Sequence, residues 1–430
     1  MTAARPAVPD AAPAAGACTT FVADAAEVWD LGRGHPLRGT RAELTRRLAA
    51  DLGVRGRPGV AVATADLASR ALMERAHTPA YLDLLADPRA ADALELLRAG
   101  LGTADTPLVP RMLSKAAAVA GASAAAATAL LEGRAVHAVS LDGGLHHAMP
   151  SGASGFCVVN DVVVAVRLLR DAGLRVAYVD LDAHHGDGVE AAFAPDPDTL
   201  TISLHQDGRT IFPGTGAATD VGVGAAAGTV VNLPLPPGTA DAGWLRAFDA
   251  VVPVLLRTFA PDVVVLQAGA DGHRLDPLTD LQLTVQGMAT AVSRVHRLAH
   301  ELAGGRLLLL GGGGYSCTDA VPRAWTQALA VVSGEPLGWN TRLPDTWRRA
   351  AQQAGGVTVP TVLGDAQADA GLLAGSAWSE PAGWVTAEGW APYRPWDAGT
   401  GDPDDRLDRA VAATRGAVFP LLALDPLIDR

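Results

Sequence analysis

Short apolar runs recur along this chain, separated by longer segments in which apolar residues repeat at helical spacing. The runs lie at 135–141, 200–204, 230–233 and 306–310, at the start of 176–188 and within 262–271. Several are continuous, which is typical of parallel strands buried on both faces. Strands that alternate with helices of about 12 or more residues indicate a parallel sheet. We therefore predict an α/β fold with a single-domain, open, mostly parallel sheet flanked by helices.

The intervening segments predict helices at 111–132, 241–259 and 283–302, and one that Asn160 and Asp161 open and Gly173 closes. The first is mostly Ala, Leu and Ser. Because Ala has the highest helix propensity and Gly commonly follows a helix end, it is expected to be a buried helix that stops at Gly133. Another helix is expected near 64–74, with Thr64 as its N-cap.

The two ends of the chain differ in composition from the part between them. Residues 1–18 are rich in Ala and Pro, and the prolines interrupt any apolar run that could act as a signal peptide. We expect these residues to form a disordered leader. We predict one main domain at 19–338. Residues 339–430 are expected to form a C-terminal extension that packs on or trails this domain, with a late helix near 404–415. No apolar segment is long enough to predict a membrane span.

Composition and charge narrow the range of partners. The 430 residues carry a net charge of −12, and no cluster of Lys or Arg stands out, which argues against direct nucleic-acid binding. The three cysteines, Cys18, Cys157 and Cys317, show no paired spacing. Reduced thiols in a cytoplasmic protein are the expected state. The oligomeric state is not predicted by these features.

Titratable residues gather where the predicted strands end. Asp180, Asp182 and His184 follow the run that begins at Val176, and alternation along an extended chain puts them on one side. Three other strand ends carry the pair His146 and His147, then Asp271, and then Tyr315. Because ligands bind at the carboxyl ends of strands in open α/β sheets, these residues are expected to line one crevice.

Asp182, His184 and Asp271 have the composition of a catalytic metal site. Three protein ligands with an open position are typical of catalytic zinc, although two carboxylates would also suit iron(II) or manganese. Such a metal polarises a carbonyl and lowers the pKa of water, so amide hydrolysis is a natural reaction.

Hydrolysis also needs proton carriers and a donor for the oxyanion. His146 and His147 could act as base and acid if Asp180 and Asp187 orient them. Tyr315 follows a run of four glycines, 311–314, and could swing in to donate its hydroxyl.

The motifs that carry these residues resemble the histone-deacetylase superfamily. They occur in order at 143–148, 155–161, 180–188, 212–216, 269–271 and 311–315, within a span of roughly 35–334. The motifs Asn160-Asp161 and His185-Gly-Asp187 are similar to those of the class I and bacterial acetoin-utilisation branch. The resemblance implies an arginase/deacetylase-like sheet and makes residues 19–338 a deacetylase catalytic domain.

The resemblance also implies a role for each matching residue. Zinc would be held by Asp182, His184 and Asp271, and Tyr315 would polarise the acetyl carbonyl. The remaining assignments are substrate contacts at Asp105, Gly155, Phe156 and Phe212, an acetate pocket near Arg41, and a monovalent-cation (K⁺) site at Asp180, Ser203 and Leu204 with the carbonyls of Asp182 and His184.

These features predict a zinc-dependent lysine deacetylase acting on acetylated proteins, with an acetylated metabolic enzyme as the expected partner and iron(II) as the alternative metal. Three alternatives remain open. An arginase-like ureohydrolase would want carboxylates where this chain has Gly186 and His273. An acetylpolyamine amidohydrolase would use the same chemistry on a small diamine, although such amidohydrolases and the class II enzymes tend to carry Asn at the position of Asp187. A non-catalytic acyl-lysine binding protein would be expected to lack Tyr315 or a metal ligand.

Two further histidines have a spacing that can bind metal. His296 and His300 lie four residues apart on one face of a predicted helix. Since the sequence indicates no third ligand, they are interpreted as structural or surface residues, as are His77, His137 and His205.

Overall fold

The computed structural model describes residues 18–32, 34–365, 383–386, 389–392, 395–397 and 405–429. The predicted leader at 1–18 lies outside the described residues except for Cys18, which begins the first strand. The predicted extension is described only in part.

A single eight-stranded sheet forms the centre of the molecule, and every pair of neighbouring strands is parallel. The predicted α/β fold is therefore confirmed. In spatial order the strands are β2 (Val60–Thr64), β1 (Cys18–Asp24), β3 (Ala135–Ser140), β8 (Leu307–Leu310), β7 (Val263–Gln267), β4 (Val176–Asp180), β5 (Thr199–Gln206) and β6 (Val230–Leu235).

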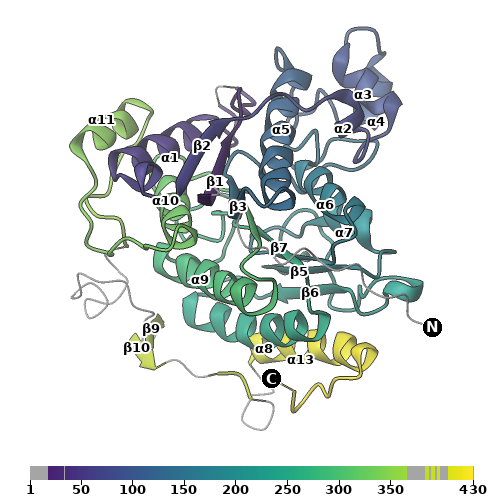
Figure 1. Ribbon diagram of the computed structural model, residues 1–430, viewed down its shortest axis with the longest axis vertical. Helices are drawn as coiled ribbons and strands as arrows, with labels where there is room; N and C mark the ends of the chain where they lie inside the picture. Colours follow the sequence, from purple (N-terminus) through teal and green to yellow (C-terminus); the bar gives the residue numbers. More distant parts are fainter. Residues whose placement is uncertain are drawn as a thin grey trace.

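Helices cover both faces of this sheet (Figure 1). Those that pack on one face are α1 (Thr40–Asp51), α8 (Asp241–Phe259), α9 (Val285–Leu302), α10 (Ala320–Val332) and α13 (Arg406–Val418). Those that pack on the other are α3 (Pro79–Ala86), α5 (Met112–Leu131), α6 (Asp161–Asp171) and α7 (Asp187–Phe193). Smaller elements are α2 (Arg70–Met73), α4 (Ala93–Arg98), α11 (Asp345–Gln353), three 3₁₀ turns at Val54–Gly56, Gly224–Ala226 and Phe419–Leu422, and the hairpin of β9 (Gly383–Thr386) and β10 (Gly389–Pro392).

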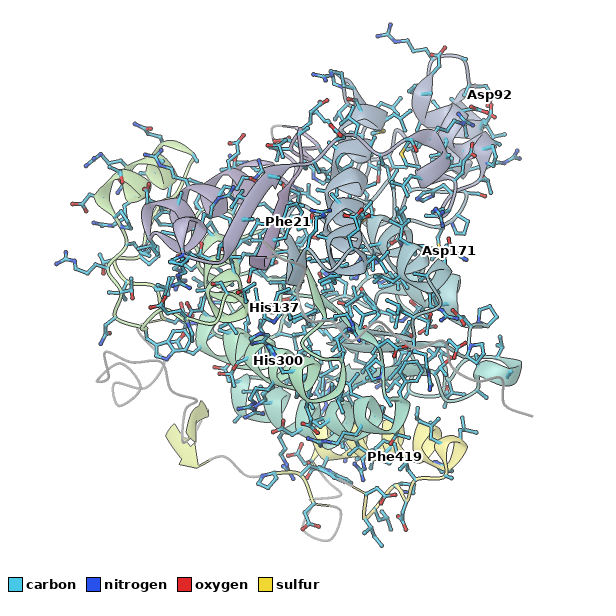
Figure 2. All side chains as sticks on the ribbon, in the orientation of Figure 1. Phe21, Asp92, His137, Asp171, His300 and Phe419 are labelled. Carbon is cyan, nitrogen blue, oxygen red and sulfur yellow. The ribbon has the colours of Figure 1, made fainter. Side chains whose placement is uncertain are left out.

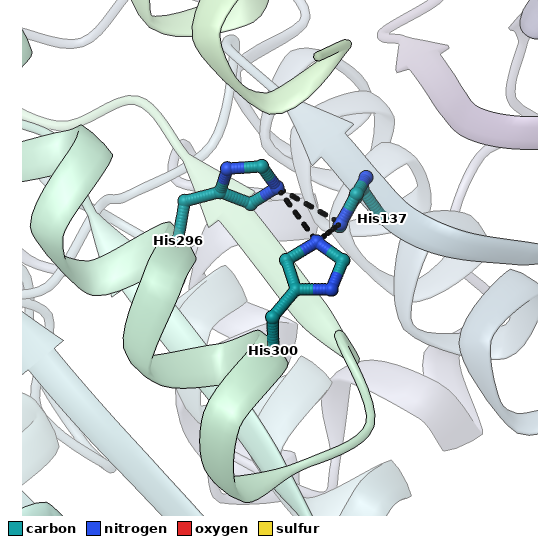
Figure 3. A group of neighbouring side chains, drawn as sticks. All are labelled: His137, His296 and His300. Atoms are coloured by element: carbon teal, nitrogen blue, oxygen red, sulfur yellow. Dashed lines mark hydrogen bonds between the residues drawn. The ribbon is translucent and has the colours of Figure 1, made fainter.

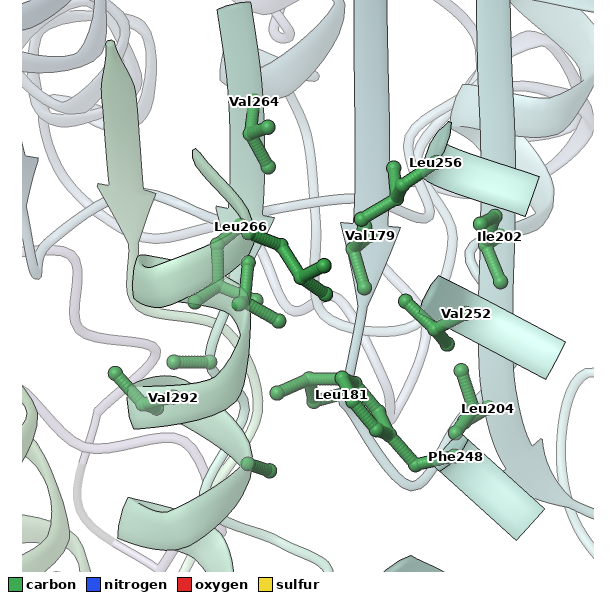
Figure 4. Close-up of a cluster of buried hydrophobic side chains, with 14 of the residues drawn as sticks. Val179, Leu181, Ile202, Leu204, Phe248, Val252, Leu256, Val264, Leu266 and Val292 are labelled. Atoms are coloured by element: carbon green, nitrogen blue, oxygen red, sulfur yellow. The ribbon is translucent and has the colours of Figure 1, made fainter. Parts of the chain in front are cut away.

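Strand alternation divides the core between the two faces. Val179 of β4 points toward α8, where it joins Val252 and Leu256 (Figure 4). Its neighbour Tyr178 belongs to the cluster on the α5 and α6 face. Both faces of β4 are buried, which explains why its sequence is continuously apolar up to Asp180.

Helix α5 is the one described helix that is long and apolar enough to cross a membrane by length and composition. In this fold 72% of its most apolar window is buried, and it packs beside α6, β1 and β3. Its small Ala side chains permit this close packing, so α5 has the properties of a core helix.

Parts of the chain beyond residue 338 contact the sheet domain. The indole Nε1 of Trp347 in α11 donates to the carbonyl of Leu44 at 2.8 Å, and the hydroxyl of Thr414 in α13 donates to the carbonyl of Asn232 at 2.7 Å. Arg246 of α8 pairs with Asp408 at 3.0 Å. The late helix expected near 404–415 is α13, whereas the division of the chain at residue 338 stays a prediction.

The expectation for Thr64 is wrong. Thr64 is the last residue of β2 and is paired in register with Asp24 of β1. The next helix, α2, begins later, and its N-cap is Ser69, whose hydroxyl accepts from the amide of Leu72 at 3.2 Å. Pairing in the sheet thus overrides the capping preference of Thr64.

Candidate active site

Four adjacent strands of the sheet, β3, β8, β7 and β4, carry the predicted catalytic residues at or beyond their carboxyl ends. Each of these strands is parallel to its neighbours, so their carboxyl ends meet at one edge. His146 and His147 follow β3, Tyr315 follows β8, Asp271 follows β7, and the segment 182–187 follows β4. The structure therefore brings these residues together at one edge of the sheet.

Asp182, His184 and Asp271 form a buried cluster whose ligand atoms all lie within 4.8 Å of one another. Nδ1 of His184 lies 3.2 Å from a carboxylate oxygen of Asp182 and 2.9 Å from one of Asp271. The second oxygens accept from backbone amides, that of Asp271 from Ala183 at 2.8 Å and that of Asp182 from Gly313 at 2.6 Å. Both carboxylates are therefore held with one oxygen directed at the imidazole.

The glycine run after β8 brings backbone against this cluster. A Cβ added to Gly313 would lie 1.9 Å from a carboxylate oxygen of Asp271 and 2.9 Å from one of Asp182. No side chain fits there without displacing both carboxylates. The close approach of this backbone explains why a glycine stands at position 313.

Two imidazole and carboxylate pairs lie beside the cluster. Nδ1 of His146 is 2.8 Å from Asp180, and Nδ1 of His147 is 2.7 Å from Asp187. The Nε2 atoms of the two rings lie 3.0 Å apart. Each carboxylate fixes the orientation of one ring, which is the arrangement predicted for an acid and base pair.

The surroundings move the pKa values of the two imidazoles in opposite directions. Burial alone would lower the pKa of His146, but the carboxylates of Asp180 and Asp182 outweigh it and raise the pKa to about 9. Burial and the neighbouring His146 lower the pKa of His147 to about 4, although Asp187 opposes this. Before any metal binds, one ring is thus protonated and the other neutral at pH 7, the separation that acid and base roles require.

Sequence reasoning missed two residues that support Asp180. The hydroxyl of Tyr178 lies 2.5 Å from Asp180 and 3.1 Å from the side-chain oxygen of Gln267. The amide nitrogen of Gln267 in turn donates to the carbonyl of Gly144 at 3.0 Å. Tyr178 lies two positions before Asp180 on the same face of β4, which is a signal in the sequence, but Gln267 becomes a neighbour only through the pairing of β4 with β7.

Aromatic rings surround the approach to the cluster. Phe212 packs edge-on against His147 with ring centroids 5.0 Å apart, and Phe156 packs edge-on against Tyr315 at 5.6 Å. Phe212 is 43% exposed, so it stands at the rim. Gly155 lies between the walls, where an added Cβ would be 2.3 Å from Cδ2 of His147 and 2.8 Å from Cε1 of Phe212.

Tyr315 completes the inner wall of this approach. Its ring lies edge-on to His184 with centroids 6.4 Å apart, and its amide donates to Asp276 at 2.7 Å. Burial, reinforced by the charge of Asp271, raises the pKa of the Tyr315 hydroxyl well above its usual value. The phenol is therefore protonated and able to donate a hydrogen bond.

Two further predicted contact residues, Arg41 and Asp105, lie in segments next to the residues described above. Arg41 is buried behind the glycine run and donates to the carbonyl of Gly314 at 3.1 Å. Asp105 is exposed, and its carbonyl lies 3.2 Å from Nε2 of His35, whose ring packs on Phe156 at 4.6 Å. Their roles as acetate-pocket and substrate-binding residues stay predictions.

The predicted monovalent-cation residues are neighbours across two strands. Asp180 of β4 pairs in register with Ser203 of β5, and Leu204 follows. The hydroxyl of Ser203 lies 2.9 Å from Nδ1 of His205. This places the three residues together, and their binding of K⁺ stays a prediction.

The geometry at Gly186 and His273 disfavours a two-metal site. A Cβ at Gly186 would lie 2.5 Å from a carboxylate oxygen of Asp180, so a carboxylate side chain has no room there. Nε2 of His273 lies 3.0 Å from Asp365. Among the described residues, the metal-binding group at this edge of the sheet consists of Asp182, His184 and Asp271 alone.

Comparisons with known proteins match this chain to one family and to several relatives. The family described as the histone deacetylase domain matches residues 35–332. The chain is 37% identical over 324 residues to the acetoin utilization protein AcuC of Bacillus subtilis, covering 75% of this chain and 79% of that protein. It is 39% identical over 282 residues to histone deacetylase 8 of Xenopus laevis, covering 65% of this chain and 84% of that protein. The acetoin utilization protein AcuC of Staphylococcus xylosus is 35% identical, over 63% of this chain and 70% of its own length.

Proposed function

Because the chain belongs to the histone deacetylase family, we propose that it is a zinc-dependent lysine deacetylase that releases acetate from acetylated proteins in the cytoplasm. Family membership supports a hydrolase of the deacetylase type. The observation that carries the finer proposal is the three-ligand cluster beside two imidazole and carboxylate pairs at one edge of the sheet.

The donor set of the cluster fits a catalytic divalent metal. One imidazole and two carboxylates suit zinc, and they suit iron(II) as the alternative in the cell. When bound, the ion would supply Lewis-acid polarisation of the acetyl carbonyl and a lowered pKa for water. The backbone amides of Gly313 and Ala183, which donate to Asp182 and Asp271 respectively, would hold both carboxylates in position for it.

The histidine pair would move the protons of the reaction. His147 is neutral and can accept a proton from the attacking water, while Asp187 holds its Nδ1 side. His146 is held protonated by Asp180, and its Nε2 lies 3.0 Å from that of His147. The carboxylates of Asp180 and Asp187 would offset the positive charge that the pair carries before the amine leaves.

Tyr315 would stabilise the oxyanion of the tetrahedral intermediate. Its hydroxyl stays protonated, and its ring lies beside the ligand His184. A donor placed where negative charge develops acts only in the transition state and therefore raises kcat.

The aromatic walls support a slender acyl-lysine as the substrate. Phe156 and Phe212 would flank the aliphatic stem, and the exposed Asp105 near His35 would hold the substrate backbone at the rim. Similarity to the acetoin utilization proteins favours an acetylated metabolic enzyme as the physiological partner over histone.

The first test compares two substrates and two tyrosine variants. Zinc-loaded wild type should release acetate from an acetyl-lysine peptide faster than from an acetylated polyamine. Tyr315→Phe should lose about 10²–10³-fold in kcat, the usual effect of removing one oxyanion donor. Acetate release is the measurement for both substrates.

Tyr81→Phe is the matched control. It also removes a buried phenolic hydroxyl, one that donates to the carbonyl of Val158 at 2.8 Å, and it should keep full turnover. Turnover of the polyamine alone would contradict the protein-deacetylase proposal and support an amidohydrolase of small amines. Zinc binding without turnover of either substrate would support a binding role instead.

A further inference from the structure

Three histidines meet on the α9 side of the sheet, outside the active site. His137 lies in β3, and His296 and His300 lie in the last two turns of α9. Nε2 of His137 lies 3.0 Å from Nε2 of His296 and 3.0 Å from Nε2 of His300. The Nε2 atoms of His296 and His300 are 3.2 Å apart (Figure 3). We propose that this trio binds one divalent transition metal such as Zn²⁺, as a second metal site separate from the active site.

Hydrogen bonds alone do not account for the arrangement. A neutral imidazole nitrogen either donates one proton or presents one lone pair. If one Nε2 of the three donates, the other two still face each other lone pair to lone pair, and if two donate, their protons face each other. A cation at the centre satisfies all three lone pairs at once.

The separations suit a metal bound by imidazole. Zinc to nitrogen bonds of about 2.0–2.1 Å in a tetrahedral site put the nitrogens about 3.4 Å apart, close to the observed spacing. Among the described residues the group contains no carboxylate or thiol, and imidazole ligands suit zinc, copper and nickel rather than magnesium or calcium. His137 is buried, His296 is half-buried and His300 is exposed, so an open fourth position would face solvent.

Local structure orients each ring toward the same point. His137 alternates with Ala138 and shares the face of Val139, which packs in the core cluster with α9 and α10. His296 and His300 are four residues apart and so share one face of α9. A Cβ at Gly305 would lie 2.9 Å from Cε1 and Nδ1 of His300, so this glycine leaves the space that the ring occupies.

The site joins elements that precede the catalytic edge. His137 lies in the first half of β3, beside the first residue of β8, and α9 leads directly into β8. His137 of β3 and His300 of α9, both labelled in Figure 2, bring these two elements together with their Nε2 atoms 3.0 Å apart. A bound metal would tie the end of α9 to β3 and stabilise the folded chain without contacting substrate.

The test counts metal in the full-length protein and its variants. Each protein is stripped with chelator, loaded with excess ZnCl₂, desalted and analysed for zinc per chain. Wild type should retain two zinc ions, and His300→Ala should retain one. The wild-type melting temperature should rise with zinc more than that of His300→Ala, while acetate release per catalytic zinc stays the same.

Glu301→Ala is the matched control, because it alters the next residue of α9 and removes only an exposed pair with Arg257. It should retain two zinc ions. His296→Ala is a second variant of the trio and should also retain one, and melting of the zinc-free proteins reports whether each is folded. Equal zinc content and equal zinc-induced shifts in wild type and both histidine variants would overturn the proposal.

Discussion

At the scale of single residues, the active site requires glycine at positions where a side chain would collide with a catalytic residue. Gly155 adopts φ +52° between His147 and Phe212, and an added Cβ would lie 2.3 Å from the His147 ring. We expect Gly155→Ala to lower kcat for acetyl-lysine peptide by about 10²-fold, because a displacement of about 1 Å in a catalytic group has that effect. Steady-state kinetics on zinc-loaded protein measures it.

Gly133→Ala separates the steric clash from backbone strain. Gly133 also has positive φ, at +64°, but an added Cβ meets no atom within 4 Å. The control variant should lose about 1 kcal/mol of unfolding free energy from left-handed strain and keep its kcat. If both variants lost activity equally, strain rather than displacement of His147 would explain the effect.

Chemistry-bearing residues near one another in sequence were the easiest to predict. Asp180 ends β4, and Asp182 and His184 follow within four residues, so one short segment carries all three. Gln267 and His137 could not be found in this way, because Gln267 meets Tyr178 only through strand pairing and His137 meets His300 only through the packing of α9 on the sheet. Sequence spacing carries no information on which strand lies next to which.

At the scale of elements, Asp365 lies in the segment after α11 and links it by a hydrogen bond to the first residue of α9. Its carboxylate accepts from the amide of Val285 at 2.8 Å, contacts His273 at 3.0 Å and pairs with Arg323 at 3.0 Å. Removal of one partner from such a buried network leaves the others uncompensated. We expect Asp365→Asn to lower the unfolding free energy by about 3 kcal/mol, measured by denaturant melts at pH 7.

The same carboxylate makes stability depend on pH. Burial alone would raise the pKa of Asp365, but the hydrogen bond from His273 and the charge of Arg323 outweigh it and hold the pKa well below its usual value. Its contribution to the unfolding free energy is therefore complete above the pKa of Asp in the unfolded chain, about 3.9. This contribution is lost as the pH falls toward the lower pKa of Asp365 in the folded protein. The difference in unfolding free energy between wild type and Asp365→Asn should become smaller below about pH 4.

Asp345→Asn is the control for the loss of a carboxylate. Asp345 opens α11 and makes an exposed pair with Arg348 at 3.2 Å. Exposed pairs contribute about 0–1 kcal/mol, so this variant should unfold nearly as wild type does. An Asp365→Asn protein as stable as Asp345→Asn would show that the network around Asp365 does not hold the segment.

Elements with strong periodicity were predictable to within a few residues. The predicted helix at 241–259 is α8 with the same bounds, and the helix at 111–132 is α5 at Met112–Leu131. The N-cap prediction at Thr64 was wrong because this residue lies in the sheet. There its pairing with Asp24 decides its conformation, although its side chain could cap a helix. Local preference is decisive only where tertiary pairing does not compete.

At the scale of the whole molecule, the sheet and the catalytic edge followed from pattern and motif, whereas the contribution of the C-terminal residues did not. The match to the histone deacetylase family ends at residue 332, and α13 lies beyond it. In the structure α13 packs against β6 and α8, with Val411 and Val418 fully buried. The sequence could not place this helix, because an amphipathic helix has no partner until the sheet it covers is known.

Phe419 tests whether these last residues are part of the folded unit. It is fully buried in the core cluster, and it lies directly after α13 (Figure 2). Truncation of a buried Phe costs about 3–5 kcal/mol, so Phe419→Ala should lower the melting temperature of the whole protein in a single transition. Ile428→Ala removes a side chain that is 72% exposed on the same terminal segment and should leave melting unchanged. If Phe419→Ala melted as wild type does, the C-terminal segment would trail the domain; a cooperative loss of stability would instead make it part of the core that supports the catalytic edge.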